Sequence, residues 1–170
     1  MILPSARIVN LGGAFTSTLL VASSFYLEYV LYLQPCSLCI LQRILYILLA
    51  AILLLAYLHH PKQRGIQVYG SLTLFLASLG VFLAGRQVWL QSLPHAPTEI
   101  CLPGFSYIIS HLPLHQALSA MLLGSDNCGV VDWTVCGWSL ACWSLLFFIL
   151  FCLLGIYQTI GGHSHKLPAK

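Results

Sequence analysis

Charged side chains are nearly missing from this chain. Only 6% of its 170 residues are Asp, Glu, Lys or Arg, whereas 59% are hydrophobic. A soluble domain needs roughly a quarter of its residues charged to cover its surface. The scarcity of charge therefore excludes a water-soluble domain and predicts one compact domain over residues 1–170 that is solvated by lipid. No basic stripe interleaved with aromatic residues occurs either, so nothing indicates nucleic-acid binding.

Several cofactor and targeting signatures are also absent. No glycine-rich dinucleotide fingerprint occurs, and the residue after Cys39 is Ile40 rather than the histidine of a c-type haem site. Arg7 precedes a long apolar run, yet no small-residue cleavage site follows a short apolar core. We therefore interpret this run as a retained membrane helix rather than a cleaved signal peptide.

The chain instead contains several long apolar runs. A membrane-spanning helix needs about 20 mainly apolar residues. Backbone groups in lipid must be satisfied internally, so these runs are predicted to be helices rather than strands. The predicted class is an all-α membrane protein, a bundle of four transmembrane helices with spans over residues about 8–33, 40–58, 68–90 and 139–157.

The connections between the spans differ in length and charge. Residues 34–39 and 59–65 are short loops, whereas residues 91–137 form a long one. Lys and Arg next to a span favour the cytoplasm. Five of the seven gather at both termini and in loop 59–65 (Arg7, Lys62, Arg64, Lys166 and Lys170). Arg43 and Arg86 lie near the opposite ends of spans, and the acidic residues gather on that opposite side (Glu28, Glu99, Asp126 and Asp132). We expect both termini in the cytoplasm of a bacterial inner membrane, with loops 34–39 and 91–137 in the periplasm.

Residues 111–123 in the long loop have apolar positions at helical spacing and few charges. The segment is too short to span the bilayer. We predict a short helix lying in the membrane interface, and the alternative is a helix packed on the outer ends of the spans.

The seven cysteines sort by their expected depth in this topology. Cys36, Cys39, Cys101 and Cys128 fall in the outward loops, where an oxidising compartment lets disulfides form. Cys152 lies inside the last span and is expected to be a small buried apolar residue. Cys136 and Cys142 flank the start of that span and are expected to be structural or inert. Their spacing neither requires nor excludes a disulfide between them.

Cys36-Ser37-Leu38-Cys39 is a C-x-x-C motif at the point where a loop becomes a helix. The partial positive charge of a helix N-terminus favours a thiolate, which is the reactive form of cysteine. Arg43 follows Cys39 by one helical turn, so its cation is expected on the same face, beside the thiolate. Snorkelling to lipid headgroups is the alternative role for Arg43. A dithiol needs an electron acceptor to turn over, and a site at the membrane edge favours a lipid-soluble two-electron acceptor.

A metal site is the competing interpretation of this motif. Structural zinc usually takes four closely spaced ligands, which the outward cysteines could supply together with a loop histidine (His95, His111 or His115). Cys101 and Cys128 are too far apart to form a second C-x-x-C, so we predict no metal. A metal-handling membrane protein, and a bundle whose disulfides only stabilise it, are the non-enzymatic alternatives.

At these motifs the sequence resembles the DsbB family of disulfide-generating membrane proteins. The segment Gln34–Arg43 resembles that family's P-C-x-L-C-x-x-x-R signature. Two further segments agree, Gly85–Gln91 with Cys101-Leu102-Pro103, and Gly124–Cys128 with Trp133, Gly137 and Trp143. The resemblance extends over nearly the whole chain.

The resemblance implies an enzyme that oxidises a periplasmic DsbA-like partner and reduces ubiquinone or menaquinone from the membrane pool. It implies two redox disulfides, Cys36–Cys39 and Cys101–Cys128. Cys101 takes the partner in a mixed disulfide, and Cys128 passes the electrons on by joining Cys36. Cys39 then faces the quinone, and Arg43 stabilises the thiolate and the developing quinone anion.

Three departures from the family pattern stand out. Gln87 occupies a position where some members carry a histidine implicated at the quinone site; a Gln can donate a hydrogen bond to a quinone oxygen but cannot become cationic. Leu140-Ala141 replaces the usual Met-Pro, and Cys136 and Cys142 replace residues that are normally not cysteine. A vitamin K epoxide reductase-like enzyme is the enzymatic alternative, although its active pair normally precedes the final span rather than the second.

Overall fold

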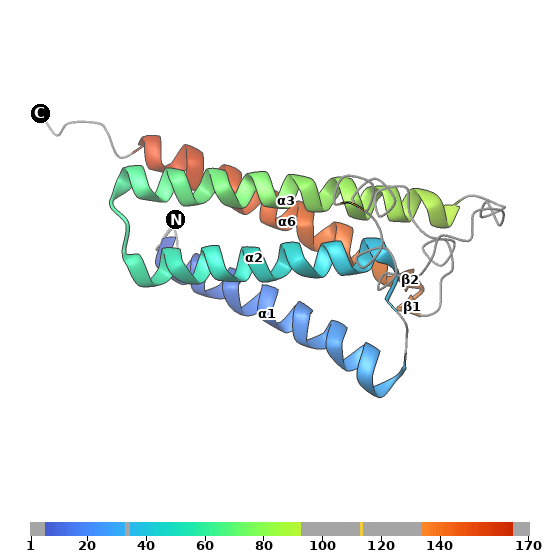
Figure 1. The fold of residues 1–170 in the computed structure, drawn as a ribbon. Helices are drawn as coiled ribbons and strands as arrows, with labels where there is room; N and C mark the ends of the chain where they lie inside the picture. Colours follow the sequence, from blue (N-terminus) through green and yellow to red (C-terminus); the bar gives the residue numbers. More distant parts are fainter. Residues whose placement is uncertain (1–5, 33–34, 93–112, 114–133, 165–170) are drawn as a thin grey trace, which may run out of the picture.

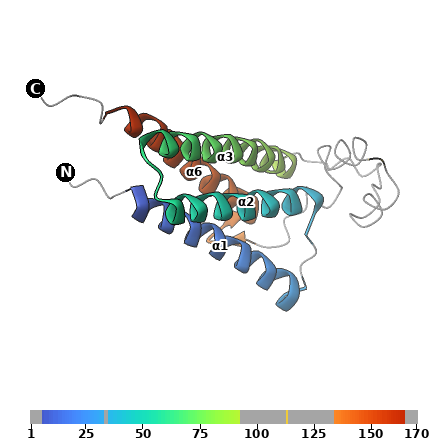
Figure 2. The ribbon, with the colours of Figure 1, turned by 60° about the vertical axis from the view of Figure 1, so that its left-hand side comes forward.

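Four long helices run up and down through the computed structural model, which describes residues 6–32, 35–92, 113 and 134–164 (Figure 1). The helices are α1 (Ala6–Val30), α2 (Ser37–His59), α3 (Gln63–Ser92) and α6 (Leu140–Ser164). Each is long and apolar enough to cross a membrane, which confirms the predicted four-helix bundle. We call the end where α2 begins and α6 begins the cysteine end, and the end where α1 begins and α6 ends the opposite end (Figure 2).

The start of α2 lies before its predicted start near residue 40. Cys36 is the N-cap, with φ −71° and ψ 166°, and its Sγ accepts a hydrogen bond from the Cys39 backbone N at 3.4 Å. This contact satisfies one of the amide hydrogens that a helix N-terminus leaves without an intrahelical acceptor. Ser37, Leu38 and Cys39 therefore belong to the first turn of a helix rather than to loop 34–39.

The turn between α2 and α3 is shorter than the predicted loop 59–65. His60 ends α2 in the left-handed conformation, with φ 46°. Pro61 follows, and the Lys62 carbonyl accepts from the backbone N of Gly65 at 2.7 Å, which starts the next helix. Only residues 60–62 are left outside helices, so Arg64 lies in the first turn of α3.

Helices α3 and α6 pack closely because glycines face bulky groups across their interface. A Cβ on Gly155 would lie 2.8 Å from the backbone N of Leu74, and a Cβ on Gly80 would lie 2.2 Å from the Phe148 ring. Small residues of this kind let membrane helices approach one another. Phe148 is fully buried and stacks on Tyr46 of α2, with 4.2 Å between ring centroids. This stack joins α6 to α2 in the middle of the bundle.

Helix α1 packs on α2 and diverges from α3 and α6 toward the cysteine end, as both views show (Figures 1 and 2). Large apolar side chains on the outside of the bundle are exposed, among them Phe15, Phe75 and Phe82. Such a surface suits helices whose outer faces contact lipid.

A short hairpin, absent from the sequence-based expectation, leads into α6. Strand β1 (Thr134–Val135) pairs antiparallel with β2 (Trp138–Ser139). The two residues between them have positive φ, 55° at Cys136 and 80° at Gly137. Positive φ at both central residues is typical of a type I′ turn, the connection that suits a two-residue hairpin.

Ser139 ties this hairpin to two helices. Its Oγ accepts from the Cys142 backbone N at 3.4 Å in the first turn of α6 and donates to Gln91 Oε1 of α3 at 2.8 Å. The start of α6 is thereby held against the end of α3. The predicted interfacial helix over residues 111–123 lies outside the described residues, apart from Pro113.

Candidate active site

The C-x-x-C motif places its two sulfur atoms together at the N-terminus of α2. Cys36 Sγ donates to Cys39 Sγ at 2.9 Å. Cys36 is buried, and Cys39 is half-buried beside a cavity inside the bundle. A small movement brings two sulfurs at this separation to the disulfide bond length of about 2.05 Å. The motif therefore has the geometry of a pair that can open and close.

Gln87 reaches this pair from α3. Its side chain is only 5% exposed, and its Nε2 donates to Cys39 Sγ at 3.2 Å and to Cys36 Sγ at 3.7 Å. The family resemblance predicts Gln87 at a quinone site. The structure brings its amide into contact with the sulfur atoms.

Three polar side chains behind Gln87 received no role in the sequence analysis. Gln42 Nε2 donates to Gln87 Oε1 at 2.7 Å, and Ser144 Oγ donates to Gln42 Oε1 at 2.6 Å. Tyr46 Oη donates to the Ser144 backbone carbonyl at 3.0 Å. The position of Gln42 could have indicated a polar contact near Cys39, because an amide one turn later in an apolar helix requires a buried partner. Nothing in the sequence pointed to Ser144, since its partners are distant in sequence.

Arg43 lines the same cavity as Cys39, as its position one turn later predicts. Its guanidinium, however, binds α1. Nη1 lies 2.6 Å from Glu28 Oε2, Nη2 donates to Ser24 Oγ at 2.8 Å, and the charge lies 4.4 Å from the centre of the Phe25 ring. An arginine within a membrane span is costly unless its charge is compensated, and Glu28 supplies that compensation. Glu28 and Ser24 thus explain how Arg43 is held at the cavity wall.

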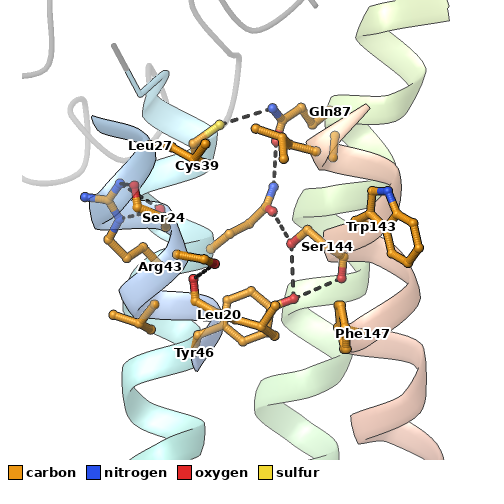
Figure 3. A pocket seen from close by; sticks show the side chains of 15 residues that line it. Leu20, Ser24, Leu27, Cys39, Arg43, Tyr46, Gln87, Trp143, Ser144 and Phe147 are labelled. Atoms are coloured by element: carbon orange, nitrogen blue, oxygen red, sulfur yellow. Dashed lines mark hydrogen bonds between the residues drawn. The ribbon is translucent and has the colours of Figure 1, made fainter. Parts of the chain in front are cut away.

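The cavity at this site has a volume of about 170 Å³ and is lined by side chains from all four helices (Figure 3). Its walls are mostly apolar, with Leu20 and Leu27 from α1 and Trp143 and Phe147 from α6. A smaller set of polar side chains also lines it (Ser23, Ser24, Cys39, Gln42, Arg43, Tyr46, Gln87 and Ser144). Apolar walls with a few convergent polar groups are typical of small-molecule sites.

A quinone fits these residues by chemistry. Its ring is planar and apolar, and its two carbonyl oxygens accept hydrogen bonds, so it needs apolar walls and nearby donors. Leu20, Leu27 and Phe147 provide such walls, and Arg43 and Gln87 carry N–H donors at the cavity.

The other predicted site residues divide into two groups. Cys101 and Cys128, together with His95, His111 and His115, lie outside the described residues. Cys136, Cys142 and Cys152 are described as free thiols, so no disulfide joins Cys136 to Cys142. Cys136 is exposed in the hairpin turn, and Cys142 is half-buried beside Ser139. Cys152, predicted to be buried, is half-buried and packs against the core. No cluster of three metal-ligating side chains occurs in the described part of the chain.

Comparison with known proteins identifies the family. The family model described as "Disulfide bond formation protein DsbB" matches residues 6–158. The chain belongs to the DsbB family. A relative named Disulfide bond formation protein B from Methylococcus capsulatus is 40% identical over 156 residues, which cover 92% of each chain. Relatives of the same name from Nitrosococcus oceani (35% over 165 residues, 96% of this chain and 98% of the relative) and Acinetobacter baumannii (40% over 160 residues, 91% of each) agree.

Membership of the DsbB family makes the chain a disulfide bond formation protein with disulfide-forming oxidoreductase activity. Its four apolar helices agree with a multi-pass protein of the bacterial inner membrane. The family implies a DsbA partner and a quinone partner in general terms.

Proposed function

We propose that this chain reoxidises a DsbA-like periplasmic dithiol oxidase and passes two electrons to ubiquinone or menaquinone. The observation that carries the proposal is the position of Cys39. Its sulfur lies at a helix N-terminus, next to a mostly apolar cavity among membrane-spanning helices, with N–H donors of Gln87 and Arg43 at the same cavity. Such a site can be reached by a lipid-soluble acceptor.

The relay consists of thiol–disulfide exchanges between two pairs, each with a thiolate attacking a disulfide sulfur. The partner's thiolate opens Cys101–Cys128 by bonding to Cys101, and the released Cys128 attacks Cys36. The Cys36–Cys39 disulfide opens, and Cys39 leaves as the thiolate. The partner's second thiol then releases Cys101 and closes the partner disulfide. Cys101 next attacks Cys128, which reforms Cys101–Cys128 and leaves Cys36 and Cys39 as a dithiol.

A bound quinone would accept the two electrons and two protons that Cys36 and Cys39 release when their disulfide reforms. The chain's own residues prepare the sulfur for that step. The Gln87 amide donates to the Cys39 sulfur, and Cys39 lies in the first turn of α2, where the helix N-terminus carries a partial positive charge. Both favour a thiolate on Cys39. Arg43 lies at the cavity wall, where its cation favours an anionic form of the acceptor. Both termini are proposed to be cytoplasmic, which puts the cysteine end toward the periplasm.

The test uses the purified chain, a reduced thioredoxin-fold dithiol oxidase, and either ubiquinone or menaquinone. Partner disulfide should appear in step with quinone reduction, and Cys39→Ser should abolish it. Cys152→Ser is the matched control, because Cys152 lies in α6 away from the cavity residues and should leave turnover intact. Unchanged turnover in Cys39→Ser would refute the relay. The quinone that supports the higher rate identifies the acceptor.

A further inference from the structure

A line of hydrogen bonds leads from Ser144 to Cys39 (Figure 3). It begins at the Ser144 hydroxyl, passes through Gln42, and ends at the Gln87 amide, which donates to the sulfur, with each link between 2.6 and 3.2 Å. Its members come from α6, α2 and α3. Three helices must therefore be packed in register for the line to exist.

The atoms that meet at each link give the line its direction. The Ser144 backbone carbonyl can only accept, so it takes the Tyr46 hydroxyl proton at 3.0 Å. The Ser144 hydroxyl lies 3.2 Å from Tyr46 Oη and donates to Gln42 Oε1 at the shorter distance of 2.6 Å. With its Oε1 accepting, Gln42 presents its NH₂ group to Gln87. Gln87 must then accept with Oε1 and present its own NH₂ group to sulfur.

Burial makes the opposite arrangement costly. Gln42 and Gln87 are each 5% exposed, so water cannot replace a lost partner. Turning the Gln87 amide over would bring its Oε1 toward the sulfur and its NH₂ group toward the NH₂ group of Gln42. Two buried donors would then face each other, and two acceptors would meet at Cys39, which the low polarity of the site penalises.

We infer that Gln42 and Ser144 are positioning residues, which hold the Gln87 amide with its N–H toward Cys39 Sγ and so favour the Cys39 thiolate. The inference rests on the proposed function only in taking Cys39 as the sulfur that gives up electrons. Cys39 Sγ also accepts from Cys36 Sγ at 2.9 Å, so the Cys36 and Gln87 side chains each present a donor to it. Donors suit a thiolate, which can only accept.

Among the described residues, few ionisable groups lie around this sulfur. From α2, Cys36 contacts it and Arg43 and Tyr46 line the same cavity, while Glu28 of α1 compensates the charge of Arg43. The cavity-lining residues of α3 and α6 are non-ionisable. Variants of Gln42, Ser144 and Gln87 therefore change hydrogen bonding at Cys39 without changing any charge.

The test measures how fast Cys39 of the full, reduced chain reacts with iodoacetamide as pH is varied, with site-resolved mass spectrometry. Gln87→Leu should lower the alkylation rate at neutral pH by about tenfold, equivalent to moving the profile up by about one pH unit. Gln42→Leu and Ser144→Ala should move it the same way, and Ser144→Thr, which keeps the hydroxyl, should restore the original profile.

The decisive variant combines Gln42→Leu with Gln87→Leu. If Gln42 acts through Gln87, the double variant has the profile of Gln87→Leu alone, because non-additivity is the mark of a shared interaction. Additive shifts, or an unmoved profile in Gln42→Leu, would overturn the inference. If Gln42→Leu does not fold, the contrast between Ser144→Ala and Ser144→Thr decides in the same way, and an identical profile for the two overturns it.

Turnover with the dithiol partner and quinone, measured on the same preparations, separates the two proposals. Absent turnover in the unsubstituted chain refutes the proposed function and leaves the alkylation profiles as a test of the positioning residues. Normal turnover with unmoved profiles refutes the positioning role alone.

Discussion

Buried amide side chains occur at both ends of the bundle. At the opposite end, Gln158 Nε2 of α6 donates to Asn10 Oδ1 of α1 at 2.6 Å, and both side chains are at most 3% exposed. At the cysteine end, Gln42 donates to Gln87 at 2.7 Å, and both are 5% exposed. The two pairs thus have the same bond type and similar length and burial.

What differs is where each pair leads. The Asn10–Gln158 pair joins α1 to α6, and Gly70 packs against Gln158. The Gln42–Gln87 pair continues to a sulfur atom and lies beside the cavity. A buried amide pair by itself therefore indicates helix pairing, and only its continuation to a reactive atom indicates chemistry.

The largest expected effect comes from the aromatic stack below the cysteine end. Gly80→Ala puts a Cβ 2.2 Å from the fully buried Phe148 ring, which must push against Tyr46. We expect a loss of about 3 kcal/mol in unfolding free energy, the upper range for overpacking. Thermal unfolding in detergent or lipid measures it. Gly85→Ala is the matched control, because a Cβ there meets nothing within 4 Å. Equal effects of the two substitutions would contradict the packing argument.

The second largest effect is expected from the arginines at the two ends of the bundle. Arg43 lies at the cavity, whereas Arg7 stacks on Tyr57 at the opposite end, 4.7 Å from its ring centre. Arg43→Ala should raise the apparent KM for quinone by about 10- to 100-fold, since a hydrogen bond to a charged group contributes about 1.5–3 kcal/mol. Steady-state kinetics at varied quinone concentration measures it, with Arg7→Ala as the control.

Glu28→Gln separates binding of the acceptor from the anchoring of α1, because it removes the ion pair and keeps the guanidinium. We expect the apparent KM of Glu28→Gln for quinone to be close to that of the unsubstituted chain. If Arg43→Ala leaves the KM unchanged, Arg43 serves only to hold α1.

A smaller effect is expected at the opposite end. Gln158→Leu leaves Asn10 buried without its described partner, so unfolding free energy should fall by about 1–3 kcal/mol. The double variant Asn10→Leu with Gln158→Leu should lose less than the two single losses combined. Neither should move the Cys39 alkylation profile, in contrast with Gln42→Leu. A moved profile would show that the two ends are coupled, and the comparison would fail.

The smallest effect is expected at the hairpin. Cys136 is exposed in the turn at the cysteine end, so Cys136→Ser should leave turnover unchanged. In intact cells, a membrane-impermeant thiol reagent should label Cys136 and spare Cys152, which lies within a span. Labelling of Cys136 only after the membrane is permeabilised would mean that the bundle has the reverse orientation.

Much of the fold could be predicted from hydrophobicity alone. Long apolar runs can satisfy their backbone groups in lipid only as helices, so the four spans followed from composition and length. Their boundaries were less predictable. The cap formed by Cys36 and the left-handed His60 set them, and neither depends on hydrophobicity. The hairpin before α6 was missed because strands of two residues have no periodicity to detect.

In the site, too, local features could be predicted from the sequence and contacts between helices could not. The C-x-x-C spacing brings its sulfur atoms together, because the motif occupies a single helical turn, and that turn also directs Arg43 toward the cavity. The partners of these groups depend on which helices are neighbours. Tertiary packing brings Gln87 to Cys39, Ser144 to Gln42, and Glu28 to Arg43. Local spacing thus determined which residues are proposed to carry the chemistry, whereas packing between helices decided which donors reach them, since a hydrogen bond requires contact that sequence distance does not specify.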